Sequence, residues 1–309
     1  MTPIAGGVAG AAAVVLAAAL DRVAAEPPAS VHPVAWFGRA VTRADRRWTR
    51  PRLVGVAVAV LLPLGAAGVA AGVVAAAGRA HPAVAAVAAG LVLFSTTSLR
   101  MLLDAARDVV EASDADLDAA RTELRALAGR DASALSAAEV RSAAVESAAE
   151  NLADGLVAPL VVFTLLAPFS LPLAAAGAAW VKAVNTLDSV LGYRAKPVGW
   201  ASARLDDAVM WVPARASAVL VAVAAGRPAS LVAARRDARV PASPNSGWPM
   251  ATLAAALDVC LEKPGHYTLH GGSELPSVGD ARRGVRVVGH AGLLAFGLAA
   301  CLLEVRAWL

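Results

Sequence analysis

Long apolar stretches recur from one end of this sequence to the other, and they constrain the fold more than any other feature. Six of them have the length of a membrane-spanning helix, which needs about 17–25 residues. They cover residues 4–20, 53–77, 83–99, 156–181, 208–225 and 289–308. The sequence therefore predicts an all-α, polytopic integral membrane protein that forms one domain over residues 1–309.

The composition and charge distribution agree with a membrane protein. Hydrophobic residues make up 58% of the chain and charged residues 17%, against about 45–50% and 25% in soluble domains. The seven arginines between residues 21 and 52 predict a cytoplasmic loop, because basic residues are retained on that side of the membrane. The net charge of +4 is modest, so we expect no nucleic-acid partner.

The segments around the later candidate spans leave the topology open. Residues 100–155 are dense in charge and predict cytoplasmic amphipathic helices. Pro168 and Pro172 interrupt 156–181, which is either one kinked span or a re-entrant hairpin of two half-helices. The stretch 208–225 is expected to kink near Pro213, and 226–288 to be a cytoplasmic loop with one short helix. Convergence of the polar clusters on the cytoplasmic side is the preferred topology.

Four acids fall on one face of the helix expected before the fourth span. Glu139, Glu146, Glu150 and Asp154 lie within roughly 100° of arc, and Ser136 forms a capping-box pattern with Glu139. Like charges on one helix face repel each other. The face is therefore either solvated or neutralised by a cation. Mg²⁺ shared with a phosphate would serve, because it prefers hard oxygen ligands.

A second polar cluster follows the fourth stretch. Lys182, Asn185 and Asp188 share one side of a helix, together with Ser189, within roughly 120° of arc. Charged groups are costly beside an apolar segment unless they are paired or used. The cluster predicts a functional site, and helix-end capping is the alternative.

Further polar residues recur at helical spacing in the next segment. Arg204, Asp207, Trp211 and Arg215 would present two guanidinium groups, a carboxylate and an indole on one face. Such groups suit phosphate or carboxylate recognition, although an internal arginine–aspartate pair is equally compatible. In the arginine-rich loop, His32 is a candidate general base or phosphate partner, or else a solvated histidine.

Five segments in order resemble the CobD/CbiB family of membrane-bound cobalamin biosynthesis proteins. No single segment is specific, but the ordered set is. They are Glu26-Pro27-Pro28 with His32-Pro33; residues 146–155 with Ala158-Pro159; residues 182–189; residues 202–207 with Pro213-Ala214-Arg215; and residues 243–249.

The resemblance implies the activity of an adenosylcobinamide-phosphate synthase. Such an enzyme would use ATP and Mg²⁺ to join the corrinoid adenosylcobyric acid to (R)-1-aminopropan-2-ol O-phosphate, or a related amino alcohol. The product would be adenosylcobinamide phosphate. We expect a multi-pass protein of the cell membrane, in contact with the lipid bilayer, with other corrinoid-pathway enzymes as candidate partners.

This chemistry suggests roles for the polar residues. We expect Mg²⁺ at Glu146, Glu150 and Asp154, and catalytic roles for Glu146, Glu150, Lys182 and Asp188. Lys182 would neutralise phosphate charge, and Asp188 would accept a proton from the amine. The expected substrate-binding residues are His32, Asn151, Asn185, Arg204, Asp207, Arg215, Asn245 and Trp248, and Trp211 would lie against the corrin ring with Trp248.

Two other classes of function are compatible with the same residues. An ion or proton transporter could use Lys182, Asp188 and Asp207 as an intramembrane relay. A non-catalytic membrane scaffold could hold other corrinoid-pathway enzymes, and its acidic helix would then tolerate substitution.

Overall fold

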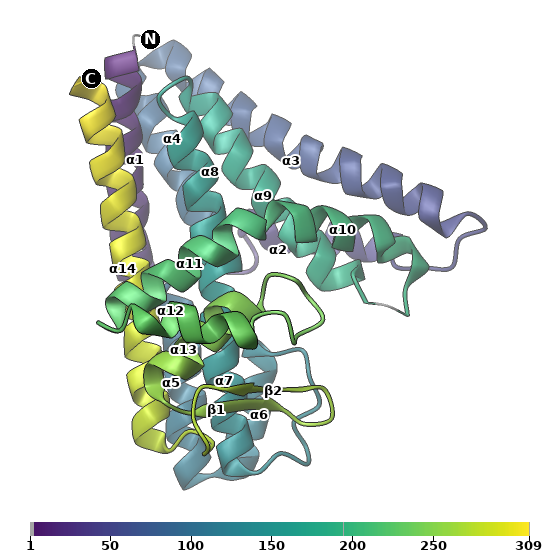
Figure 1. The fold of residues 1–309 in the computed structure, drawn as a ribbon. Helices are drawn as coiled ribbons and strands as arrows, with labels where there is room; N and C mark the ends of the chain where they lie inside the picture. The colour runs from purple at the N-terminus through teal and green to yellow at the C-terminus, as the bar shows by residue number, and fades with distance from the viewer. Residues whose placement is uncertain (1–2, 194, 309) are drawn as a thin grey trace. The chain divides into compact units, whose positions relative to one another are not determined.

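The computed structural model describes residues 3–193 and 195–308, and the chain is helical through most of that length (Figure 1). Five helical stretches are long and apolar enough to cross a membrane, or six if one bent helix pair counts as a span. Strand is confined, in the described residues, to one short antiparallel hairpin. The predicted all-α polytopic membrane fold is confirmed.

The chain divides into two compact units, each assembled from separated segments. The first unit comprises residues 1–98, 154–210 and 296–309, and the second comprises 99–153 and 211–295. Neither unit is one continuous piece of sequence, so no linker separates two successive domains. The prediction of one domain over 1–309 stays a prediction.

The first unit is built from long apolar helices that pack through small residues. It contains α1 (Pro3–Ala24), α2 (Pro33–Val41), α3 (Pro51–Ala80), α4 (Pro82–Thr96), α8 (Ala158–Leu166), α9 (Leu171–Leu191), α10 (Trp200–Val209) and the end of α14 (Val278–Trp308). A Cβ atom on Gly7 of α1 would lie 2.7 Å from the carbonyl oxygen of Leu303 in α14. One on Gly90 of α4 would lie 2.9 Å from the Leu16 side chain in α1. Backbones that approach this closely are typical of helix packing in membranes.

The stretch 156–181 forms a helical hairpin. Helix α8 ends at Leu166, a turn follows, and Ser170 caps the start of α9 by accepting a hydrogen bond from the Leu173 N–H group at 3.3 Å. A Cβ atom on Gly177 of α9 would lie only 2.6 Å from Val162 of α8, so the two helices pack tightly. A single kinked span is wrong here, because the helix ends at Leu166 and a new helix begins at Leu171 after a turn, with Pro172 in the first turn of that helix, where it is tolerated.

The second unit surrounds the helix that carries the acidic residues. It contains α5 (Arg100–Ala115), α6 (Leu117–Leu127), α7 (Ala137–Leu152), α11 (Trp211–Ala224), α12 (Ala229–Ala233), α13 (Gly247–Leu257), β1 (Cys260–Lys263), β2 (Tyr267–His270) and the start of α14. The capping box of Ser136 and Glu139 at the start of α7 is confirmed. Most of α7 is buried, so its acids do not form one solvated face.

Three sequence-based expectations for the C-terminal part are wrong in detail. The helix break in 208–225 lies at Met210, because Pro213 falls in the first turn of α11, where it is tolerated. Residues 226–288 contain α12, α13 and the β1–β2 hairpin rather than mostly loop. The last helix begins at Val278 instead of Gly289, since charged residues on one face of an amphipathic helix do not end it.

Candidate functional site

Three segments of the first unit converge on one group of polar side chains, which we call the aspartate cluster. It comprises Asp154, Lys182, Asn185, Asp188, Asp206 and Asp207. Asp154 comes from the π-helix Ala153–Val157 that precedes α8, the next three residues come from α9, and the last two come from α10. A π-helical turn widens the helix and is frequent at functional sites.

Asn185 lies at the centre of the aspartate cluster. Its side chain is within hydrogen-bonding reach of both Asp154 and Asp206. Helical spacing predicts that Asn185 lies on the same side of α9 as Lys182 and Asp188. The interaction of Asn185 with Asp206 is an additional link, between α9 and α10. An amide can donate two hydrogen bonds, so Asn185 can serve both carboxylates without adding charge.

The cluster carries more negative charge than its lysine can balance. Asp206 interacts electrostatically with Asp154, Asp188 and Asp207, and Lys182 interacts with Asp154. One oxygen of Asp188 and one of Asp206 are buried without a hydrogen-bond partner. Unpaired buried carboxylate oxygens are costly. A cation or protons must therefore accompany the folded cluster.

A histidine–glutamate pair adjoins this cluster. Glu26 interacts electrostatically with Lys182, and its Oε2 lies 3.3 Å from Nε2 of His32. His32 is buried and caps α2, where its Nδ1 accepts a hydrogen bond from the Val34 N–H group at 3.2 Å. The imidazole is thus held at both nitrogens rather than solvated. Arg204 lies on the exposed side of α10 and pairs with Asp207 at 3.4 Å.

An apolar cavity of about 760 Å³ lies next to Lys182 in the same unit. Its walls come from α2, α3, α4 and α9, and Trp36, Val69 and Leu91 are among the lining residues. A few polar side chains, among them Lys182 and Thr186, interrupt this lining. The lysine therefore belongs both to the aspartate cluster and to an apolar space.

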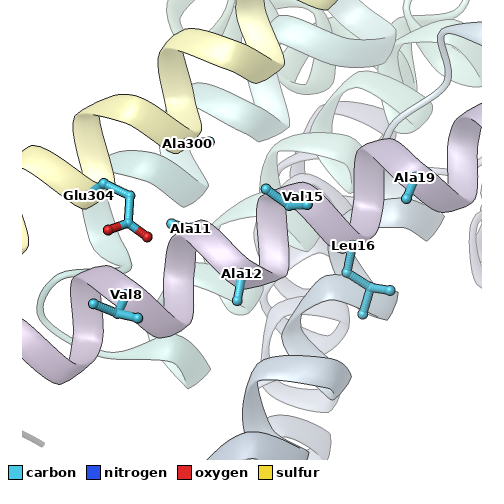
Figure 2. Close-up of a pocket in the computed structure, with 8 residues that line it drawn as sticks. All are labelled: Val8, Ala11, Ala12, Val15, Leu16, Ala19, Ala300 and Glu304. Atoms are coloured by element: carbon cyan, nitrogen blue, oxygen red, sulfur yellow. The ribbon is translucent and has the colours of Figure 1, made fainter.

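A second hollow of about 500 Å³ lies between α1 and α14. Alanine, valine and leucine side chains form nearly all of its lining, and Figure 2 shows Glu304 pointing from α14 toward α1. Among the described residues that line this hollow, Glu304 is the charged one.

In the second unit, Glu146 is the centre of a separate buried network. It is fully buried, and its Oε2 accepts hydrogen bonds from Arg130 at 2.8 Å and from the Tyr267 hydroxyl at 3.0 Å. Ser142 donates to its Oε1 at 3.1 Å and accepts from the Glu262 N–H group at 2.7 Å. Figure 1 shows the β1–β2 hairpin beside α7, and these contacts fasten it there.

The charge of Glu146 also acts on the tyrosine. Burial raises the pKa of the Tyr267 hydroxyl above its ordinary value, and the carboxylates of Glu146 and Glu150 raise that pKa further. Tyr267 is therefore a neutral donor at ordinary pH. Glu146 already has a cation and two hydroxyl donors as partners, so its negative charge is compensated by the protein itself.

A third group in the second unit surrounds Arg215. Its guanidinium lies over the rings of Trp211 and Trp248, at 4.5 and 5.2 Å from their centroids. It donates to Asn245 Oδ1 at 2.7 Å. The internal arginine–aspartate pair that the sequence also allowed is formed by Arg204 and Asp207, whereas these contacts of Arg215 are to neutral groups. The predicted residues Arg215, Asn245 and Trp248 thus meet at one place.

The remaining predicted residues are distributed between these groups. Asn151 donates to the Ser147 carbonyl one turn back on its own helix. Glu150 is half-buried and acts electrostatically on Tyr267. Among residues 3–193 and 195–308, no three histidine, cysteine or acidic side chains are arranged to hold a metal by themselves. The predicted magnesium role of Glu146, Glu150 and Asp154 stays a prediction.

Sequence reasoning missed several residues of these groups. Asp206 directly precedes Asp207, which the sequence predicts as a site residue. The sequence shows that residue 206 is an acid, but it does not show which residues Asp206 contacts. Arg130 and Tyr267 lie 16 and 121 residues from Glu146. The periodicity of a helix or strand relates residues within one element, so it cannot predict contacts over such separations in sequence.

Comparison with known proteins agrees with the motif order. A family model described as CobD/Cbib protein matches residues 14–291. The chain belongs to the CobD/CbiB family. A protein of Methanothrix thermoacetophila named probable cobalamin biosynthesis protein CobD is 37% identical over 303 residues, covering 94% of this chain and 95% of that protein. The Salmonella typhimurium cobalamin biosynthesis protein CbiB is 38% identical over 284 residues, covering 87% and 86%.

The CobD/CbiB match includes every residue of the three polar groups described above. A Klebsiella pneumoniae protein named cobalamin biosynthesis protein CobD is also 38% identical, over 87% of this chain and 86% of its own. No solved structure matches the chain.

Proposed function

We propose that this chain is a cobalamin biosynthesis enzyme that joins adenosylcobyric acid to (R)-1-aminopropan-2-ol O-phosphate, or a related amino alcohol, at the expense of ATP. The relatives' names support the pathway. The aspartate cluster is the observation that carries the proposed reaction. It gathers residues from three of the five segments that resemble the family, with the histidine–glutamate pair of a fourth beside it. It combines an amine, an amide and several carboxylates.

The reaction needs an activated carboxylate, because a carboxylate is a poor acyl donor. A carboxylate oxygen of adenosylcobyric acid would attack the γ-phosphorus of ATP, which gives an acyl phosphate and ADP. The amine nitrogen would then attack the acyl carbon. The C–N bond forms, inorganic phosphate leaves as the acyl C–O bond breaks, and the nitrogen loses a proton.

The residues of the cluster match these two steps. Lys182 is the cation in the cluster, so it would stabilise charge on the transferring phosphoryl group. Asp188 has a buried oxygen without a hydrogen-bond partner, and this oxygen would take the proton from the amine. Asn185 would keep Asp154 and Asp206 in place. The apolar lining of the cavity beside Lys182 would keep this side of the site poor in water, which would strengthen its electrostatic interactions.

The cluster also fits a magnesium ion in its donor chemistry. Mg²⁺ is usually held by one or two carboxylates together with water and substrate phosphates. Asp206, which has an unpartnered buried oxygen, and Asp154, which interacts with it, supply that number of carboxylates and leave Asp188 free to act as the base. When bound, Mg²⁺ would neutralise the ATP phosphates. Asp154 is the member of the predicted magnesium set that lies in this cluster, whereas the charge of Glu146 is already compensated by Arg130.

The other predicted residues would bind the substrates. His32, fixed by Glu26, and Arg204 with Asp207 lie in the same unit as the aspartate cluster. Arg215, Asn245 and Trp248 offer a guanidinium, an amide and an indole for a phosphate and a flat ring. For Glu150 we keep the catalytic and magnesium-binding role suggested by its position in the sequence, and for Asn151 the substrate-binding role.

One assay tests the proposed reaction. Purified protein in detergent is given adenosylcobyric acid, ATP, Mg²⁺ and aminopropanol phosphate, and the products are separated by mass. We expect an amide product, ADP and phosphate in equal amounts. The variant Asp188→Asn should lose at least 100-fold in rate, within the range for loss of a general base of about 10²–10⁴. The matched control is Asp108→Asn, which changes an exposed acid of α5.

A proton or ion relay is the competing function that one observation favours. Carboxylate oxygens without partners, beside Lys182 and near candidate spans, are also typical of transport pathways. Flux in proteoliposomes without ATP, together with no amide product, would overturn the ligase in favour of transport. Full pathway function of Asp188→Asn in cells would instead favour a non-catalytic scaffold.

A further inference from the structure

Among the described residues, Arg215 in the second unit is held by hydrogen bonds to neutral acceptors only. Besides the bond to Asn245, it donates to the Trp211 carbonyl at 2.9 Å and to the Pro244 carbonyl at 3.4 Å. All three acceptors are neutral. They fix the plane of the guanidinium between two indoles, but they do not cancel its positive charge.

A second arginine, Arg239, acts on the same place. The positive charge of Arg239 acts electrostatically on the guanidinium group of Arg215. Gly247 explains the closeness, because a Cβ atom there would collide with the carbonyl group of Ala238. The segment that carries Arg239 is thus packed directly against the start of α13. Two like charges held together repel each other, and an anion between them would relieve that repulsion.

One further donor, the indole of Trp248, lies beside Arg215. Helix α13 begins at Gly247, but its end adds few donors, because the Trp248 N–H group already donates to the Asn245 carbonyl oxygen at 3.1 Å and Pro249 has no N–H group. The indole Nε1 of Trp248 is buried without a hydrogen-bond partner. This donor adds to the arginines and would not form an anion site without them.

We propose that Arg215 and Arg239, with the turn 243–249, bind a dianionic phosphate group. Two guanidinium groups match a charge of about −2 at neutral pH, which a phosphomonoester carries and a carboxylate does not. Their planar forks also match phosphate oxygens in pairs. This proposal rests on the proposed function only for the source of the phosphate, which is either the amino alcohol phosphate or ATP.

A purely structural role for Arg215 makes a different prediction. The hydrogen bonds of Arg215 to Asn245 and Pro244 connect α11 to the turn before α13. Arg239 makes neither of these two hydrogen bonds. If Arg215 has only this structural role, replacing Arg239 removes a repulsive charge and leaves phosphate binding unchanged. If the two bind phosphate, the same replacement weakens phosphate binding while the protein stays as stable or becomes more stable.

The direct test is a titration of the full-length protein in detergent with inorganic phosphate, at ionic strength held constant with chloride. Tryptophan fluorescence is the readout, because Trp211 and Trp248 flank Arg215. We expect Arg239→Gln to weaken phosphate binding at least tenfold without a lower Tm. The matched control Arg235→Gln, an exposed arginine of the same segment, should bind like the wild type.

Enzyme kinetics then distinguish the two sources of phosphate. A higher KM of Arg239→Gln for aminopropanol phosphate, with KM for ATP unchanged, assigns the site to the amino alcohol, and the reverse assigns it to ATP. Equal phosphate binding by Arg239→Gln and the wild type would overturn the proposal, as would equal losses in both variants. The titration decides this even if the protein forms no amide product, so failure of the ligase and failure of the site are separable.

Discussion

At the scale of single residues, Tyr267 holds the β1–β2 hairpin to α7 through a neutral hydroxyl. Its raised pKa means that the folded protein keeps a proton that the unfolded chain releases near pH 10. The stabilisation is therefore complete below that pH and is lost as pH rises above it. We expect the free energy of unfolding to fall by up to about 1.4 kcal/mol per pH unit there.

The measurement is Tm between pH 8 and about 11 for the wild type and Tyr267→Phe. The phenylalanine variant should be less stable at pH 8 and show a shallower decline. Tyr193 is the chain's other tyrosine and is exposed, so Tyr193→Phe should decline like the wild type. An unchanged slope in Tyr267→Phe would contradict the assignment of the titration to Tyr267.

Asp206 gives a second prediction at this scale, because it interacts with three other carboxylates. Removing one charge should leave Tm in EDTA unchanged or higher. It should also reduce the rise in Tm that Mg²⁺ produces, which for the wild type corresponds to about 2.7 kcal/mol at 100 times Kd. We therefore expect Asp206→Asn to lose at least half of that rise. Asp108→Asn should keep it, and an equal rise in Asp206→Asn would exclude Asp206 from magnesium binding.

At the scale of secondary-structure elements, α3 supports the start of the segment that leads into α10. A Cβ atom on Gly55 would collide with the Val198 carbonyl oxygen in the short 3₁₀ helix Pro197–Gly199. We expect Gly55→Ala to cost about 1–3 kcal/mol of stability, as in overpacked cores. Since Asp206 lies on α10, activity should fall as well.

The same helix offers a matched control for that substitution. A Cβ atom on Gly68 would meet nothing within 4 Å. Gly68→Ala should therefore be neutral or stabilise the protein by up to about 1 kcal/mol, the helix-propensity difference between the two residues. The comparison is made by Tm in one detergent. Equal Tm values for both variants would show that α3 does not support Val198.

At the scale of the whole molecule, the sidedness of the polar groups is the open prediction. Convergence requires that the first and second units expose their polar segments on the cytoplasmic face. The exposed residues Ser189 and Ala242 lie in these two units. In a variant with Cys260 and Cys301 replaced, we expect Ser189→Cys and Ala242→Cys to react with an impermeant maleimide from the cytoplasmic side only.

The experiment uses sealed vesicles of known orientation, with labelling from each side and after detergent. Reaction of the two cysteines from opposite sides would contradict convergence. The proposed phosphate site in the second unit would then be unable to serve chemistry in the aspartate cluster.

The sequence alone determined the class of the fold and the identity of most polar groups. Apolar stretches of spanning length predict helices because an unpaired backbone is too costly in lipid, and α1, α3 and α4 follow those stretches closely. Helical spacing also placed Lys182, Asn185 and Asp188 on one side of α9. Spacing acts within an element, so these predictions needed no knowledge of packing.

Only the tertiary structure decided which elements bring their residues together. The contact of Asn185 with Asp206 and the pairing of Arg130 with Glu146 join segments whose separation follows no period. The β1–β2 hairpin was missed because two strands of four residues carry little signal without the helix they cover. Such contacts depend on burial and long-range packing, which a sequence fixes only through the complete fold.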